Sequence, residues 1–139
     1  MLTSKLKEGI IILNNIKENS ENMDIKKCYQ AFGGDYEDVF VRLSSDERIE
    51  RFVKKFVELD DCGQMLAALE QNDYRTVFLK AHDLKGTSSN LGFTALYDSS
   101  FELCEALRAG QPSRDISPLV EAVKSDCEKI AQAVKQFDT

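Results

Sequence analysis

The sequence predicts an all-α protein, built as an antiparallel four-helix bundle with additional short helices near its N-terminus. Apolar residues recur every three to four positions along most of the 139 residues, which is the spacing of one helix face. No segment has the strict polar–apolar alternation of a half-buried strand. Capping residues and glycines divide the pattern into amphipathic segments joined by short loops. Such segments pack most readily as antiparallel neighbours.

Residues 1–22 are predicted to form an N-terminal extension of a bundle domain that we place at residues 23–139. We expect this extension to be helical over residues 3–19, where four apolar residues have helical spacing: Leu6, Ile10, Leu13 and Ile16. Met1 and Met23 are both candidate starts of the chain.

Two short helices are expected ahead of the bundle, over residues 24–32 and 36–43, where they would cover one end or side of it. Gly33-Gly34 ends the first helix, because glycine readily adopts the left-handed conformation that follows a helix. Asp35 then stands where a side-chain oxygen can cap the free N–H groups of the second helix.

Four longer segments are predicted to form the bundle: residues 45–70, 73–91, 95–109 and 116–137. At the start of the first segment, Ser44 and Glu47 have the spacing of a capping box for a helix over 45–59. Asp60-Asp61 and Gly63 then break or bend the chain. The buried face of this helix is predicted to consist of Ile49, Phe52, Val53, Phe56 and Val57.

The remaining boundaries rest on capping residues and helix breakers. They are Asn72 or Asp73 and Gly92 for the second segment, Thr94 and Gly110-Gln111-Pro112 for the third, and Pro118 for the start of the fourth.

Composition excludes several classes of protein. Hydrophobic residues make up 42% of the chain and charged residues 30%, as in ordinary globular proteins. A net charge of −6 argues against a protein that binds nucleic acid or an anionic membrane surface. The longest apolar run, Ile10-Ile11-Ile12-Leu13, is too short to span a bilayer, and no signal-peptide cleavage site follows it. We therefore expect a cytoplasmic monomer.

The four cysteines, Cys28, Cys62, Cys104 and Cys127, are widely spaced and form no C-x-x-C pair. A zinc ribbon or a thioredoxin-type motif is therefore unsupported. We expect buried free thiols and no bound metal or cofactor.

His82 is the only histidine of the chain, and helical geometry predicts that it faces solvent. At about 100° per residue, one face of the helix over 73–91 carries the buried stripe: Val77, Ala81, Leu84, Ser88 and Leu91. His82 lies roughly opposite, on one face with Lys85, Gly86 and Ser89. A neutral imidazole exposed on a rigid helix is a competent nitrogen nucleophile at neutral pH.

The neighbours of His82 fit the transfer of an anionic group between proteins. Lys85, one turn away, can offset the charge of a phosphoryl group on the imidazole. Gly86 costs the helix about 0.5–1 kcal/mol relative to alanine, and the missing β-carbon leaves room for a partner to approach. The Ser89 hydroxyl is a candidate hydrogen-bond donor, and Phe78 is expected as an exposed apolar contact for docking.

The stretch from His82 to Leu96 resembles a known signature. His82-Asp83-Leu84-Lys85-Gly86, followed by Asn90-Leu91-Gly92 and Leu96, is similar to the H-x-L-K-G-x-x-x-N-L-G-x-x-x-L motif of histidine-containing phosphotransfer (HPt) domains. These domains are helical bundles of multistep two-component phosphorelays. Phe32-Gly33-Gly34-Asp35 also looks like the segment that precedes the bundle in many members, so the resemblance covers roughly residues 24–137.

Carried over by position, the resemblance implies that His82 is the phospho-acceptor and that Lys85 stabilises the phosphohistidine. It implies that Gly86 leaves room for the partner and that Ser89 occupies a position that is often small or polar. Many members place a Gln or Glu on the next helix to orient the imidazole. Cys104 stands in that place here, next to Glu105, which departs from the family pattern.

The resemblance further implies a phosphohistidine carrier rather than an enzyme. Its partners would be receiver domains of response regulators and of hybrid sensor histidine kinases, which supply the acidic pocket and the Mg²⁺. Two other hypotheses remain open. One is a helical interaction module that is not phosphorylated and that binds or inhibits a kinase or receiver. The other is a small enzyme with His82 as general base, although Asp83 points about 100° away from it on the helix.

Overall fold

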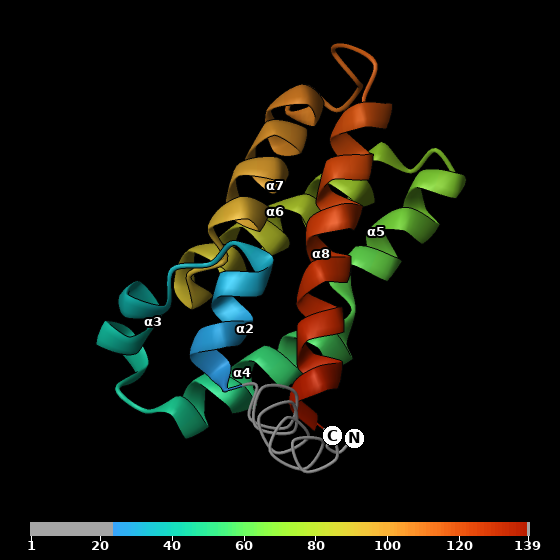
Figure 1. Cartoon of the computed structure of the whole chain (residues 1–139). Helices are drawn as coiled ribbons and strands as arrows, with labels where there is room; N and C mark the ends of the chain where they lie inside the picture. Colours follow the sequence, from blue (N-terminus) through green and yellow to red (C-terminus); the bar gives the residue numbers. More distant parts are fainter. Residues whose placement is uncertain (1–23, 139) are drawn as a thin grey trace, which may run out of the picture.

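The computed structural model describes residues 24–138, and this part of the chain is helical with short connecting loops (Figure 1). It contains no strand, which confirms the all-α class. The described helices are α2 (Ile25–Phe32), α3 (Tyr36–Leu43), α4 (Asp46–Leu59), α5 (Asp61–Glu70), α6 (Tyr74–Leu91), α7 (Thr94–Leu107) and α8 (Ser117–Asp138). The predicted extension over residues 1–22 lies outside the described residues. No described helix is long and apolar enough to cross a membrane.

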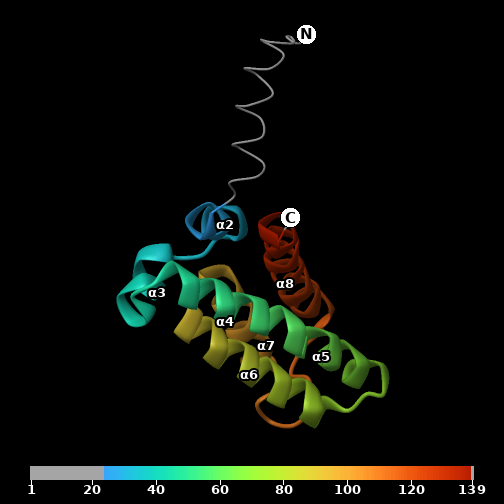
Figure 2. The ribbon, with the colours of Figure 1, turned by 90° about the horizontal axis from the view of Figure 1, so that it is seen from below.

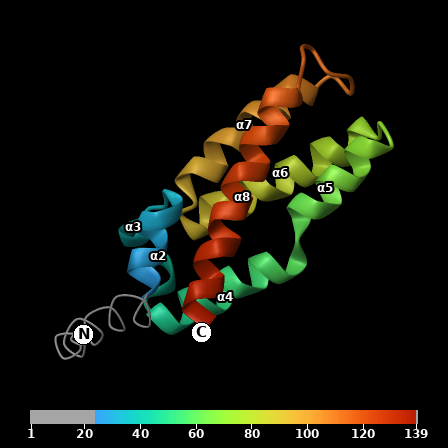
Figure 3. The ribbon, with the colours of Figure 1, turned by 45° about the vertical axis from the view of Figure 1, so that its right-hand side comes forward.

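Helix α6 lies in the middle of the fold, between α5 and α7. Helix α8 packs against α7 along one part of its length and against α2 along another (Figure 3). Helix α4 crosses near α6 and α8, and α3 connects it to α2 (Figure 2). The two short helices therefore cover one end of the longer ones, as the sequence predicted.

An aromatic cluster joins α2 and α4 to the turn between α6 and α7. Phe93, in that turn, contacts Phe32 at a centroid distance of 5.3 Å and Phe56 at 5.1 Å. Tyr29 lies 4.7 Å from Phe32 and 5.9 Å from Phe93. Each buried aromatic ring contributes about 1.5–3 kcal/mol through the area removed from water, and tilted pairs add about 0.5–1.5 kcal/mol. This cluster fixes the C-terminal end of α6.

Asp60 both ends α4 and starts α5. Its backbone is left-handed, with φ 51°, and its N–H donates to the Phe56 carbonyl. Its carboxylate accepts the free N–H of Gly63 at 3.1 Å. A β-carbon at residue 63 would collide with that carboxylate. The predicted break in the segment 45–70 is therefore a sharp corner at one residue.

Two predicted helix caps are wrong by one residue. Ser44 ends α3 in the left-handed conformation, and it is Ser45 that caps α4 by accepting the Arg48 N–H. Ser44 is taken up by the end of α3, so the N-terminal cap of α4 falls on the next residue, Ser45. Thr94 lies inside α7, and Phe93 occupies the cap position without a side-chain hydrogen bond. The Gly33 carbonyl accepts a free N–H there instead, from Ala95 at 3.2 Å.

Phe52 was predicted to be buried with the core face of α4, but 48% of its surface is exposed. The residues that face the core are Ile49, Val53 and Phe56. Phe52 lies at the edge of that face, over an apolar groove between α4 and α6 that Leu59 also lines. The helical period identified the core face correctly but included two residues too many, because Val57 is also only partly buried.

Candidate functional site

Helix α6 begins at a side-chain cap and buries the stripe that the sequence predicted. Asp73 accepts hydrogen bonds from the Thr76 N–H at 3.2 Å and the Thr76 hydroxyl at 2.7 Å. These bonds hold the pKa of the Asp73 carboxyl below its usual range. The residues that α6 buries are Val77, Ala81, Leu84, Ser88 and Leu91. All five were expected, so the opposite face of α6 is turned to solvent.

His82 is exposed on that outer face, as the helical wheel predicted. The imidazole lies beside the ring of Phe78, one turn earlier, at a centroid distance of 6.1 Å and an interplanar angle of 39°. Within residues 24–138, no hydrogen bond or ion pair involves the imidazole. Both ring nitrogens are therefore accessible to an incoming group.

Lys85 lies on the same side of α6 and leans toward α7. Its ammonium Nζ is 5.5 Å from the centre of the Phe101 ring, within the range of a cation–π contact. The positive charge also reaches Glu105 on α7, whose pKa is lowered first by the hydrogen bond from Arg108 and to a smaller extent by Lys85. An aromatic ring of α7 thus holds the Lys85 cation beside the face of α6 that carries His82.

Gly86 is exposed, and a β-carbon added there would have no atom within 4 Å outside its own helix. Packing inside the chain therefore does not require glycine at this position. The residue is in the middle of α6, where glycine is less stable than alanine. The remaining explanation for glycine here is the open space that it leaves above the helix surface beside His82.

Ser89 and Phe78, the two other residues predicted for this face, differ from each other in exposure. Ser89 is exposed on the predicted face, but seven residues separate it from His82, about 10 Å along the helix axis. Its proposed hydrogen bond to a group on His82 stays a prediction. Phe78 was expected to be exposed and is instead half-buried against the core, with one edge beside the imidazole.

Two exposed apolar side chains near this face were not singled out from the sequence. Leu79, one turn before His82, is 45% exposed, and Phe101, beside Lys85, is 38% exposed. Tyr97 stacks on Phe101 at a centroid distance of 6.3 Å. The spacing of Leu79 from His82 was a usable signal. No such signal indicated that Phe101 lies beside Lys85, because that contact depends on how α7 packs against α6.

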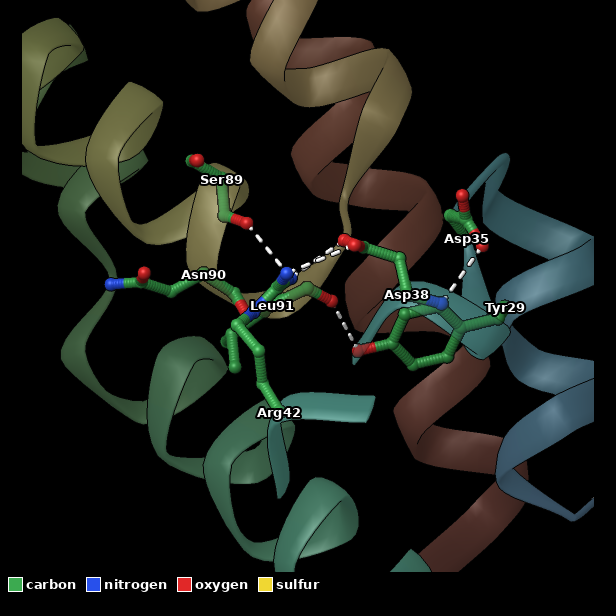
Figure 4. Close-up of polar contacts among 7 residues, drawn as sticks. All are labelled: Tyr29, Asp35, Asp38, Arg42, Ser89, Asn90 and Leu91. Atoms are coloured by element: carbon green, nitrogen blue, oxygen red, sulfur yellow. Dashed lines mark hydrogen bonds and ion pairs between the residues drawn. The ribbon is translucent and has the colours of Figure 1, made fainter. Parts of the chain in front are cut away.

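Arg42 of α3 holds the C-terminal end of α6 (Figure 4). It donates from Nε to the Asn90 carbonyl and from Nη2 to the Ser89 carbonyl, both at 2.9 Å. The same guanidinium forms a two-bond ion pair with Asp38, at 2.9 and 2.6 Å. The last carbonyls of a helix have no hydrogen-bond donor within that helix, so Arg42 supplies the donors that the end of α6 lacks.

Two further contacts secure the same helix end. The Tyr29 hydroxyl donates to the Leu91 carbonyl at 2.6 Å (Figure 4), and the Asp35 N–H donates to the Gly92 carbonyl at 2.7 Å. Gly92 has φ 70°, and a β-carbon there would collide with the Asp35 carbonyl. The helix that carries His82 is thus capped at its start by Asp73 and anchored at its end by α2 and α3.

A protein-family model described as Hpt domain matches residues 55–133, more than half of the chain. The chain belongs to the Hpt domain family. Membership implies histidine phosphotransfer in a phosphorelay, through contact with receiver domains, by a carrier rather than an enzyme. The matched region runs from the end of α4 into α8 and contains His82 with its neighbours. No curated protein and no solved structure gives a significant match to the chain.

In this Hpt domain, α7 offers no polar side chain to the imidazole from the place where many members carry Gln or Glu. Cys104 is fully buried, and burial raises the pKa of its thiol. Glu105 is exposed and paired with Arg108. The part of α7 that reaches the site is Phe101, through its contact with Lys85. Residues 24–138 contain no cluster of three or more side chains able to hold a metal ion.

Proposed function

We propose that this Hpt protein accepts a phosphoryl group on His82 from a phospho-aspartate receiver domain and passes it to another receiver. The observation that carries the proposal is the imidazole itself. It is exposed at the middle of a helix anchored at both ends, and the described residues make no hydrogen bond to it. Its position in the motif shared with the family supports the assignment.

In the transfer, one imidazole nitrogen attacks the phosphorus atom of the partner's aspartyl phosphate. The nitrogen–phosphorus bond forms as the bond from phosphorus to the aspartate oxygen breaks, and the carboxylate leaves. The receiver supplies the divalent metal, which we expect to be Mg²⁺, while this chain supplies the nucleophile and a surface that lets the partner approach. Gly86 contributes to that access, because no side chain stands above the helix there.

Lys85 is proposed to stabilise the phosphohistidine. A charge-assisted hydrogen bond to a phosphoryl oxygen is stronger than a contact with an aromatic face at an exposed site. We therefore infer that the Lys85 ammonium leaves the Phe101 ring when His82 is phosphorylated. Ser89 is the candidate for an additional hydrogen bond, and Phe78 and its neighbours form an apolar part of the docking surface.

The proposal includes the finer assignments made from the sequence. The partners are receivers of response regulators and of hybrid sensor kinases, and the carrier works as a cytoplasmic monomer. Residues 23–139 form the phosphotransfer domain, with an antiparallel bundle at its core, and residues 1–22 are an extension.

The test uses the full chain with a phosphorylated receiver domain and magnesium. Labelled phosphate should move onto the chain, the label should be labile in acid, and it should be absent from His82→Gln. A chain that binds several phosphorylated receivers without taking up label would instead be an interaction module, and the proposal would be wrong. Circular dichroism of His82→Gln should match the wild type, because an exposed side chain is being changed.

A further inference from the structure

Two of the four cysteines meet between α5 and α8, although half the chain separates them in the sequence. Cys62 is the second residue of α5, and Cys127 lies near the middle of α8. Both line one cavity of about 50 Å³, together with Phe56, Val57, Asp60, Asp61 and Ala131. A water molecule occupies about 30 Å³ in the liquid, so the cavity can admit a molecule of similar size.

Because both cysteines line this small cavity, their thiols lie within range of one another and affect each other's ionisation. The hydrogen bond from Cys127 lowers the pKa of Cys62, and the same bond together with burial raises the pKa of Cys127. Cys62 also lies in the first turn of α5, where the helix dipole favours a negative charge, so we assign the thiolate to Cys62. Thiolates, not thiols, react with peroxides and disulfides.

The other two cysteines lack such a partner. The Cys28 sulfur donates to the Ala133 carbonyl at 3.6 Å, and burial raises the pKa of its thiol to about 11. Cys104 is fully buried in α7, and burial raises its pKa as well. Reactivity is therefore expected at one pair of cysteines rather than at all four.

We propose that Cys62 and Cys127 form a modification site that hydroperoxides convert to a reversible disulfide. The Cys62 thiolate attacks one oxygen of hydrogen peroxide, and the oxygen–oxygen bond breaks. The leaving hydroxide takes up the proton that Cys62 lost and departs as water, which gives a sulfenic acid at Cys62. The Cys127 sulfur then attacks the Cys62 sulfur, the sulfur–oxygen bond breaks, and a second water leaves. The peroxide is reduced by two electrons, and the two thiols are oxidised to one disulfide.

The disulfide would close a loop that contains the whole of α6 and α7. It would also fix the corner between α4 and α5, next to Asp61, whose carboxylate pairs with Lys80 of α6 at 3.4 Å. A cross-link that closes a long loop stabilises the folded chain chiefly by restricting the unfolded one. The proposal rests on the shared cavity that both cysteines line between α5 and α8, and it does not depend on phosphoryl transfer.

The experiment treats the reduced full chain with hydrogen peroxide, blocks the remaining thiols with an alkylating reagent under denaturing conditions, and maps the peptides by mass spectrometry. The expected product is a monomer with Cys62 and Cys127 joined and with Cys28 and Cys104 alkylated. A thiol reductant should restore four alkylated cysteines. The Tm of the oxidised chain should rise by an amount on the order of 5–10 °C.

Cys62→Ala and Cys127→Ala should each abolish the cross-link and the rise in Tm, with folding of each variant checked by circular dichroism before oxidation. Three results would overturn the proposal. They are a cross-link that involves Cys28 or Cys104, disulfide-linked dimers as the main product, and separate oxidation of Cys62 and Cys127 without a bond between them. Because the readout is the mapped disulfide, failure here would leave the phosphotransfer proposal unaffected.

Discussion

At the scale of single residues, the outer face of α6 contains one reactive group and few contacts that restrain it. The imidazole of His82 lies beside the Phe78 ring and has no hydrogen bond or ion pair within residues 24–138, and the Lys85 ammonium lies over the Phe101 ring. A cation held by an aromatic face at an exposed site is bound by about 0.5–1 kcal/mol, so it is easily released. The ammonium is therefore available to a phosphoryl group when one arrives.

Replacing Lys85 with alanine should shorten the lifetime of the phosphorylated chain by roughly two- to tenfold, because a solvent-exposed charged hydrogen bond is lost. Lys80→Ala is the matched control, since the Lys80 ammonium is paired with Asp61. Loss of label from the purified phosphorylated protein measures the effect. Equal lifetimes for the wild type and Lys85→Ala would remove the role that we give to this lysine.

Gly86→Ala should stabilise the protein by about 0.5–1 kcal/mol, because alanine favours the helix and its β-carbon has open space around it. Gly86→Gln should leave the helix no less stable but should slow transfer, since a long side chain then stands beside His82. Thermal unfolding and the labelled-phosphate assay test the two effects separately. A destabilised alanine variant, or full transfer by the glutamine variant, would contradict this account of the glycine.

At the scale of elements, α6 depends on α2 and α3 at its C-terminal end. Arg42 satisfies the carbonyls of Ser89 and Asn90, and Tyr29 satisfies that of Leu91. The two residues that donate these hydrogen bonds lie outside residues 55–133, which the family model matches, whereas the carbonyls that accept them lie inside. The short helices are therefore part of what makes this site rigid.

Arg42→Ala should lower the free energy of unfolding by about 1 kcal/mol, a modest value because solvent screens the ion pair with Asp38. Arg42→Lys should recover part of it, because lysine keeps the charge but lacks the forked geometry. Amide hydrogen exchange at Phe93, whose N–H donates to the Ser88 carbonyl, should accelerate in the alanine variant. Unchanged exchange there would mean that the helix end does not need the arginine.

Much of this level of structure could be predicted from local sequence, and the misses share one cause. The helical period identified all five buried residues of α6, because periodicity reports the face of an isolated helix. It placed Phe52 wrongly because exposure at the edge of a face depends on the neighbouring helix. The contact of Arg42 with Ser89 and that of Lys85 with Phe101 join residues on different helices, and no local pattern encodes them.

The candidate site likewise combines features of one helix with contacts between helices. The histidine face and the open space at Gly86 followed from angles on one helix. The proximity of Cys62 and Cys127 could not be predicted from the sequence, since it depends on how α5 packs against α8. The burial of Cys104, which removes it from the imidazole, likewise depends on the packing of α7.

At the scale of the whole molecule, the carboxylates in side-chain or cap hydrogen bonds make the fold sensitive to acid. Four carboxyl groups have a lowered pKa because hydrogen bonds favour their charged form: Asp38, Asp73, Glu105 and Asp115. Glu50 is the opposite case, since burial raises its pKa. In the unfolded chain the four groups take up protons at a higher pH than in the folded chain.

The stability that these four groups contribute is therefore present above the ordinary carboxyl range and is lost as the pH falls through it. We expect the Tm to fall between about pH 5 and pH 2. Asp73→Asn should flatten part of that decline, because asparagine caps a helix without titrating. A Tm that stays level or rises across this range would show that other groups dominate.

The anchored ends of α6 also bear on the direction of phosphoryl flow. A helix that is fixed before its partner arrives loses little conformational freedom on docking. The entropy cost of ordering α6 should therefore be small with every receiver that docks. In the transfer that we propose, the described part of the chain makes no hydrogen bond to the imidazole, so we expect the energy of the nitrogen–phosphorus bond to be set mostly by its own chemistry and by Lys85. Whether phosphate runs forward or backward along the relay then depends on how strongly each receiver holds its own aspartyl phosphate.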